Sequence, residues 1–184
     1  MTEAGSGNMS TVTDTNSGTY TETIGSTTAE TVTVTAAISG TDVTDTATVT
    51  FTATAATVAN STLTASPTSV AADGTSSTMT LQAKDANGNN LSTGGLTVTM
   101  TESGSATLNT VTDNNNGTYT ATITSTTAET VTVTAAISGT DVTDTATVTF
   151  TATAATVANS TLTASPTSVP AVGTTTTVTL QAKE

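Results

Sequence analysis

Threonine alternates with apolar residues along most of this chain, and this period of two restricts its fold more than any other feature. Single threonines separate Tyr119, Ala121 and Ile123, and the same alternation runs through residues 131–135 and 146–152. A period of two places successive side chains on opposite faces of an extended strand, whereas an amphipathic helix has a period of 3.6. The pattern predicts half-buried β-strands with threonine outside, and its regularity argues against disorder.

Seven such segments occupy the middle of the chain, and turn sequences separate them. Asp73-Gly74, Asn87-Gly88 and Asn116-Gly117 lie between alternating segments, where glycine or asparagine adopts a positive φ at little cost. Short strands spaced in this way are typical of an antiparallel sandwich. Pro67 has no N–H to donate, which is compatible with an edge strand or with a chain that switches between sheets. The seven predicted strands contain residues 63–65, 79–83, 96–100, 106–108, 119–123, 131–135 and 146–152.

The chain also repeats itself with an offset of 99 residues. Residues 1–85 align without a gap on residues 100–184, and 70 of these 85 positions are identical. Only Ala86–Thr99 occurs once. Turn-rich segments at 55–61 and 154–160 follow long alternating segments, and dividing the chain there gives one unit of immunoglobulin-like size, about 100 residues.

The repeat therefore predicts tandem immunoglobulin-like sandwiches, an all-β fold. We expect the C-terminal part of one unit over residues 1–56, a complete unit over 57–155, and the N-terminal strands of a third over 156–184. We further expect the chain to be a segment of a longer tandem array.

The composition excludes several classes of function. Of the 184 residues 58 are threonine, two are lysine, and none is arginine, histidine, cysteine or tryptophan; the formal net charge is −12. Without histidine or cysteine there is no thiol nucleophile and no thiolate–imidazole metal site, so we expect no enzyme, no catalytic residues, no metal and no cofactor. The negative charge argues against nucleic acid, and no apolar run is long enough to insert into a membrane.

The strand and turn sequences resemble the bacterial Ig-like repeats of invasin/intimin-type adhesins. The resemblance rests on Leu63–Gly74, Met79–Asn89 and Gly117-Thr-Tyr119, and departs from the family's pattern at Asn90 and Val172. It implies a stiff spacer stalk on the extracellular surface of a bacterium. The partners would be neighbouring repeats of the same chain or head-to-tail copies. No segment resembles a receptor-binding tip, so the receptor is unknown.

Acidic residues suggest two further hypotheses. Asp85-Ala-Asn-Gly-Asn-Asn90 has oxygen-bearing side chains at alternating positions, as calcium loops do, and Asp113–Gly117 and the pair Asp141 with Asp144 are other candidates. The favoured interpretation is turn chemistry. Pairs such as Asp141 with Asp144, and Glu102 with Asp113, suggest either glycosidase carboxylates or solvated turn acids, and the lack of an aromatic platform that could hold a sugar favours the second.

The two incomplete units suggest an alternative function. Strands at 162–183 could complete the N-terminal half-unit of another copy and form an extracellular filament head to tail. A third hypothesis is a binding module whose threonine-rich faces contact ice, sugar or another cell. Ice binding is disfavoured because a twisted sandwich lacks a flat lattice.

Overall fold

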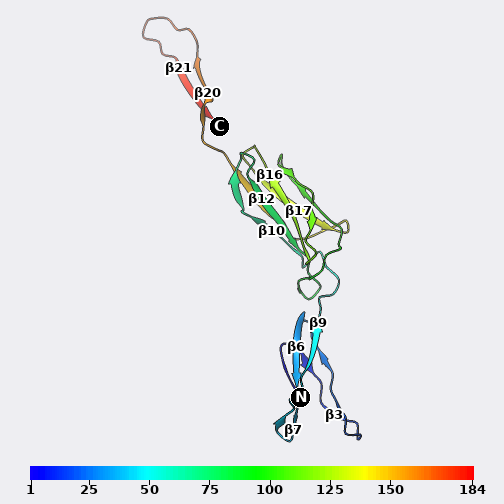
Figure 1. Ribbon diagram of the computed structural model, residues 1–184. Coiled ribbons are helices and arrows are strands. Elements are labelled where there is room, and N and C mark those ends of the chain that lie inside the picture. The colour runs from blue at the N-terminus through cyan, green and yellow to red at the C-terminus, as the bar shows by residue number, and fades with distance from the viewer.

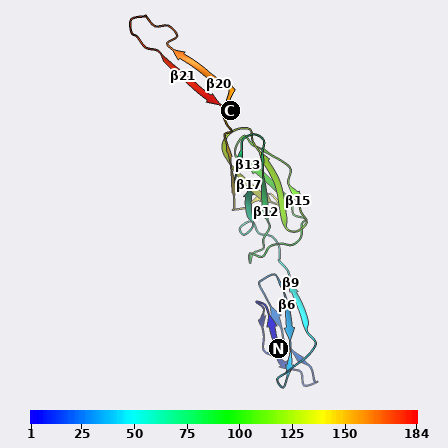
Figure 2. The same ribbon diagram turned by 60° about the vertical axis from the view of Figure 1, so that its left-hand side comes forward.

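The computed structural model describes all residues, 1–184, and contains strands and turns but no helix. Three parts follow one another lengthwise, with residues 1–56 at one end and residues 156–184 at the other (Figures 1 and 2). We call residues 1–56 the N-terminal part, 57–155 the central unit and 156–184 the C-terminal hairpin. No helix is present that is long and apolar enough to span a membrane.

The central unit is a sandwich of two five-stranded sheets. Its strands are β10 (Thr62–Ser66), β11 (Ser69–Ala71), β12 (Ser76–Gln82), β13 (Val98–Glu102), β14 (Thr107–Leu108), β15 (Thr112–Asp113), β16 (Thr118–Thr124), β17 (Glu129–Ile137), β18 (Thr140–Asp141) and β19 (Ala146–Thr151). One sheet has the order β10-β12-β16-β14, and β15 also pairs with β16. The other has the order β11-β19-β17-β13, and β18 also pairs with β17. The predicted all-β sandwich is confirmed.

The structure adds three short strands to the seven predicted ones. β15 and β18 are two residues long and flank turns, so alternation could not reveal them. β11 exists because the chain crosses to the other sheet at Pro67, between the end of β10 and the start of β11. There β11 pairs with β19 in parallel, the one departure from the predicted antiparallel pattern.

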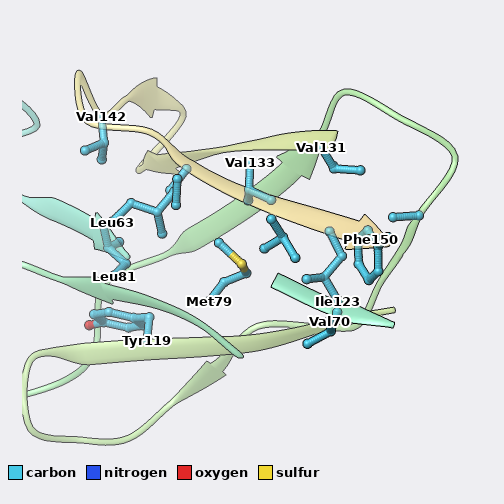
Figure 3. Close-up of a cluster of buried hydrophobic side chains, with 14 of the residues drawn as sticks. Leu63, Val70, Met79, Leu81, Tyr119, Ile123, Val131, Val133, Val142 and Phe150 are labelled. Atoms are coloured by element: carbon cyan, nitrogen blue, oxygen red, sulfur yellow. The ribbon is translucent and has the colours of Figure 1, made fainter. Parts of the chain in front are cut away.

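The alternation of apolar and polar residues matches the burial pattern. Along β16, Tyr119, Ala121 and Ile123 are buried, and the threonines between them are half-buried on the outer face. Seventeen buried apolar residues form one core cluster. In Figure 3 Met79 lies near the middle of this core, with Phe150 and Ile123 toward one end. Each sheet thus contributes one apolar face to a single core.

The N-terminal part repeats only the second half of this sandwich. Its strands are β1 (Thr2–Ala4), β2 (Asn8–Met9), β3 (Thr13–Asp14), β4 (Tyr20–Thr21), β5 (Ile24–Gly25), β6 (Glu30–Thr35), β7 (Ala37–Ile38), β8 (Thr41–Asp42) and β9 (Ala47–Phe51). The pairing β1-β6-β9 repeats β13-β17-β19 with the offset of 99 residues. Counterparts of β10, β11 and β12 are missing from this part, which leaves one face of its core open.

The open face changes the environment of identical residues. Tyr119 is 1% exposed, and its hydroxyl accepts a hydrogen bond from the Leu96 N–H (3.0 Å). Its repeat counterpart Tyr20 is 56% exposed, and Val32 is the only buried residue of the N-terminal part. The counterpart of the seven-residue β16 is divided into β4 and β5 in the N-terminal part, and only the central unit has a closed core.

The C-terminal hairpin repeats the first strands of the sandwich. It consists of β20 (Thr156–Ser165) and β21 (Thr177–Lys183), which pair antiparallel with each other and with no other strand. The register of Leu162 opposite Leu180 repeats that of Leu63 opposite Leu81. The hairpin has no buried residue.

Candidate junction between successive units

A buried carboxylate, Asp85, lies where the central unit meets the N-terminal part. Asp85 follows β12 and is 1% exposed. Its Oδ2 accepts hydrogen bonds from the Thr54 N–H (3.0 Å) and the Asn89 side-chain amide (3.0 Å). Its Oδ1 accepts from the backbone N–H groups of Asn87 and Asn89, both at 2.9 Å. One carboxylate thus holds its own turn and the chain that arrives from the preceding unit.

The turn after Asp85 has the sequence Ala-Asn-Gly-Asn. Gly88 adopts a φ of +83°, in the left-handed region that favours glycine, and its N–H donates to the Asp85 carbonyl (3.0 Å). The Asp85 N–H in turn donates to the Asn89 carbonyl (3.0 Å). This geometry is the one expected of a hairpin turn, because N–H groups of the protein donate hydrogen bonds to both carboxylate oxygens of Asp85.

Asn89 makes contacts across the junction. Its Oδ1 accepts a hydrogen bond from the Ala29 N–H (2.9 Å), and its Nδ2 donates to the Thr27 carbonyl (2.8 Å). Thr27 and Ala29 belong to the turn between β5 and β6, about sixty residues earlier in the chain. The Asn89 side chain therefore ties a turn of the N-terminal part to the turn that Asp85 organises.

A second set of hydrogen bonds fixes the connecting segment, residues 55–61, which joins the N-terminal part to the central unit. The Asn60 amide donates to the carbonyls of Asp85 (2.8 Å) and Ala86 (2.9 Å). The Ser61 hydroxyl donates to the Thr57 carbonyl (2.7 Å) and accepts from the Lys84 N–H (3.0 Å). Because these bonds satisfy the connecting segment along its length, it is anchored to the central unit rather than free.

The junction recurs one repeat later with a longer carboxylate. Glu184 occupies the position of Asp85, and the N–H and hydroxyl of Thr153 both donate to its Oε2, the hydroxyl at 3.0 Å. The Asn159 amide donates to the Glu184 carbonyl (2.7 Å), as Asn60 does to that of Asp85. Hydrogen bonds of the junction thus recur with the same 99-residue offset as the strands of the sandwich.

Hydrogen bonds set the electrostatics of the acidic residues. The Thr54 N–H, followed by the Asn89 amide, holds the pKa of the Asp85 carboxyl well below its usual range. The backbone N–H and hydroxyl of Ser105 lower the pKa of Glu129, and the hydroxyl of Ser6 does the same for its counterpart Glu30. These carboxylates are structural acceptors of hydrogen bonds.

Three of the remaining four acidic candidates accept hydrogen bonds from backbone N–H groups. Asp113 accepts from the N–H groups of Gly95 (2.7 Å) and Asn115 (2.8 Å), and Asp144 accepts from the Leu63 N–H (3.0 Å). Glu102 accepts from the Gly104 N–H, and Asp141 lies exposed in β18. No group of three acidic side chains that could hold a metal ion occurs in the chain.

A shallow hollow lies beside the junction. It has a volume of about 560 Å³ and is lined by small, hydroxyl and apolar residues that include Val58, Leu91 and Ile137. No titratable side chain lines it. This hollow offers surface contact but no acid–base or metal chemistry.

The sequence predicts a turn residue or a calcium ligand at Asp85 and does not predict its part in the junction. A signal was present, because Thr54, Asn60 and a carboxylate at position 85 all recur 99 residues later. What the sequence did not indicate is that Asn89 reaches the turn at 27–29, since that contact depends on how two units meet.

Comparison with known proteins identifies the family. The family described as "Invasin, domain 3" matches residues 57–153, more than half of the chain. The chain belongs to the invasin domain 3 family. The resemblance to invasin/intimin-type adhesins is confirmed.

Three solved structures are similar to this chain. FdeC, an adhesin of Escherichia coli, is 33% identical with a TM-score of 0.64, and the match covers 100% of this chain and 61% of FdeC. Invasin, a bacterial integrin-binding protein, is 33% identical with a TM-score of 0.58, covering 90% of this chain and 34% of invasin. InvD of Yersinia pseudotuberculosis is 26% identical with a TM-score of 0.59, and the match covers 90% of this chain and 51% of the InvD chain.

The chain is thus shorter than these structures and spans less than two thirds of each. A comparison with curated protein sequences gives no match. At the level of the family, the chain is an Ig-like segment of a bacterial adhesin.

Proposed function

We propose that this chain is a stiff, non-catalytic spacer segment of a bacterial cell-surface adhesin, and that it acts outside the cell. Its parts would be residues 1–56, 57–155 and 156–184, and its partners the neighbouring repeats. The observation that carries the proposal is the junction, in which Asp85 and Asn89 bond to Thr54, Thr27 and Ala29 of the preceding unit. A spacer needs joints that resist bending, and several directed hydrogen bonds around a short connecting segment supply that resistance.

The exposed surface supports the same function. Threonines of neighbouring strands pair through their hydroxyls, as Thr101 does with Thr134 (2.9 Å) and Thr130 with Thr149 (3.2 Å). Such a face is well hydrated and carries little charge. A stalk needs length and solubility more than a specific binding surface.

The test is a distance measurement across the junction. The chain has no cysteine, so spin labels can be attached at Thr41→Cys and Thr107→Cys, two exposed positions in the two parts. Double electron–electron resonance should give one narrow distance distribution. Asn89→Ala should broaden it, because the contacts with Thr27 and Ala29 are lost.

The matched control is Asn109→Ala, which removes a hydrogen bond to Thr122 inside the central unit and none at the junction. It should leave the distribution narrow. A broad distribution in the unsubstituted chain would contradict the spacer function.

A second candidate function is that of a subunit in an extracellular filament formed head to tail. The observation that favours it is the apolar surface of the C-terminal hairpin, where Leu162, Val178 and Leu180 are all more than half exposed. Its test is sedimentation of the 184-residue chain over a range of concentrations. A monomer at all concentrations would contradict the filament, while the spacer function would stand.

A further inference from the structure

An early strand and the last strand of the central unit lie side by side and run in the same direction. β11 pairs in parallel with β19, with Ser69 opposite Thr149 and Ala71 opposite Thr151. The other strand pairs of the two five-stranded sheets are antiparallel. The parallel pair therefore joins the segment by which the chain enters the unit to the strand by which it leaves.

Hydrogen bonds cross this pair at both of its ends. The Thr149 N–H donates to the Thr68 carbonyl (2.9 Å), and the Ala72 N–H donates to the Thr151 carbonyl (2.8 Å). The Thr151 hydroxyl donates to the Val70 carbonyl (3.2 Å). Backbone and side chain together tie this short segment to β19.

Two further hydrogen bonds extend the same contact toward the start of the unit. The Leu63 N–H donates to the Asp144 carboxylate (3.0 Å), and the Thr143 N–H donates to the Val58 carbonyl (3.3 Å). Val58 and Leu63 precede β11, and Thr143 and Asp144 precede β19. The contact between the two segments thus keeps its parallel sense from residue 58 to residue 72.

Core side chains cover the parallel pair on its inner face. Val70 lies opposite Phe150, and both are buried. Figure 3 shows these two side chains at the same end of the core as Ile123. Because the core keeps water from this face of the pair, water competes less for its hydrogen bonds.

β19 is also held on its other edge. It pairs with β17 from Glu129 opposite Phe150 to Val133 opposite Ala146. β11, by contrast, pairs with β19 alone. A load on the parallel pair therefore separates β11 from β19 and leaves β19 in its sheet.

The chain enters and leaves the central unit at opposite ends (Figures 1 and 2). Tension along the chain therefore pulls β11 toward one end and β19 toward the other, along their common axis. Because the two strands are parallel, this pull slides one strand past the other, and their hydrogen bonds bear the load together. An antiparallel hairpin pulled at its two ends would instead lose its hydrogen bonds one after another.

We propose that the parallel contact between residues 58–72 and 143–151 is a mechanical clamp that keeps the central unit folded under tension. This inference rests on the proposed spacer function and adds to it the load that the spacer bears. A spacer between two points of attachment transmits every pull between them. A unit that unfolded under such a pull would lengthen the stalk and lose its fixed reach.

The first experiment changes the direction of the load and leaves the clamp intact. The chain has no cysteine, so DNA handles for optical tweezers can be attached at introduced pairs. Ala55→Cys with Ala155→Cys loads the clamp along its strands. Thr75→Cys with Ala155→Cys pulls β11 and β19 apart at the end where both strands finish. All three positions are exposed.

The pair at 55 and 155 should unfold at about twice the force of the pair at 75 and 155, or more. The physical reason is that hydrogen bonds break together in the first geometry and singly in the second. Neither pair loads residues 1–54 or 156–184, so the two incomplete units contribute nothing to the measured force.

The second experiment removes one hydrogen bond of the clamp. Ala72→Pro eliminates the N–H that donates to Thr151 and should lower the unfolding force of the pair at 55 and 155. It should also bring that force closer to the force of the pair at 75 and 155. A variant that was merely less stable would lower both forces in proportion.

Ala71→Pro is the matched control. N–H groups of successive residues point to opposite edges of a strand, so the Ala71 N–H points away from β19. The repeat itself has Pro170 at the position that corresponds to Ala71. Ala71→Pro should therefore leave the unfolding force unchanged in both geometries.

The outcomes separate the clamp from the function on which it rests. Equal forces for the two handle pairs in the chain without proline substitutions would overturn the clamp, even if Ala72→Pro did not fold. The spacer function would still stand if the distance distribution across the junction were narrow. A broad distribution together with the expected difference in force would overturn the stiff spacer and support the clamp. Equal losses of force for Ala71→Pro and Ala72→Pro would contradict the assigned hydrogen bonds.

Discussion

At the scale of single residues, carboxylates in this chain act as acceptors that organise turns. Asp85 is the clearest example, because backbone and side-chain N–H groups from both sides of the junction converge on it. Glu129 and Asp73 accept similar hydrogen bonds within the central unit. The sequence predicted that Asp85 and Asp73 lie in turns, but it could not predict which N–H groups would surround them.

The lowered pKa of Asp85 makes stability depend on pH. A carboxylate whose pKa is depressed in the folded state stabilises the fold above its unfolded pKa of about 4, and this contribution is lost as the pH falls. The melting temperature should therefore decrease from about pH 5 toward pH 2. The Asp85→Asn variant lacks one contributing carboxylate. Its melting temperature should therefore be lower than that of the unsubstituted chain at pH 7 and should change less steeply with pH.

Asp141→Asn is the control for that titration, since Asp141 lies exposed in β18. Thermal denaturation followed by circular dichroism measures all three proteins. Equal slopes for Asp85→Asn and the unsubstituted chain would show that Asp85 does not stabilise the fold through its charge.

At the scale of elements, a glycine fixes the turn that leads into β16. Gly117 adopts a φ of +82°, and a Cβ built on it would lie 1.9 Å from the Leu91 carbonyl oxygen. Gly139 adopts a nearly identical φ of +81°, but a Cβ there would meet no atom within 4 Å. Gly139 lies in the turn between β17 and β18, so both are turn glycines, and only the structure distinguishes the crowded glycine from the open one.

This difference predicts unequal effects of alanine. Gly139→Ala should cost about 1–2 kcal/mol, the penalty of the left-handed conformation alone. Gly117→Ala should cost clearly more, because the Leu91 backbone must also move. Urea denaturation measures both free energies of unfolding, and equal values would contradict the proposed close contact.

The repeat supplies a second matched pair, in which sequence is constant and environment differs. Leu81→Ala removes a fully buried side chain from the core and should cost about 2–5 kcal/mol. Leu180→Ala alters the same repeat position in the free hairpin and should leave the central unit's stability unchanged. The measurement is urea denaturation at a concentration where the chain is monomeric, and a large loss for Leu180→Ala would contradict it.

These pairs show how much of the fold could be predicted from the sequence alone. Alternation and turn residues predicted the seven main strands, because period two directly encodes which face of a strand is buried. They did not predict β11, since a three-residue strand that pairs in parallel after Pro67 leaves no periodic signal. Nor did they predict the contact of Asn89 with the turn at 27–29, because tertiary geometry determines it.

At the scale of the whole molecule, the offset of 99 residues repeats the junction together with the sandwich. Thr54, Asn60 and Asp85 at one junction correspond to Thr153, Asn159 and Glu184 at the next. A chain built from such units extends in one direction (Figure 1). The length of each unit then sets the reach of the proposed spacer.

Small-angle X-ray scattering of the monomeric chain tests this proposal most directly. Strands of about ten residues at about 3.3 Å each, plus turns, give about 40 Å per unit. We expect the scattering of a stiff rod, with a maximum dimension of about 100 Å or more. Asn89→Ala should broaden the distribution of shapes, and Asn109→Ala should not. A compact particle, or a freely jointed one in the unsubstituted chain, would contradict a stiff spacer.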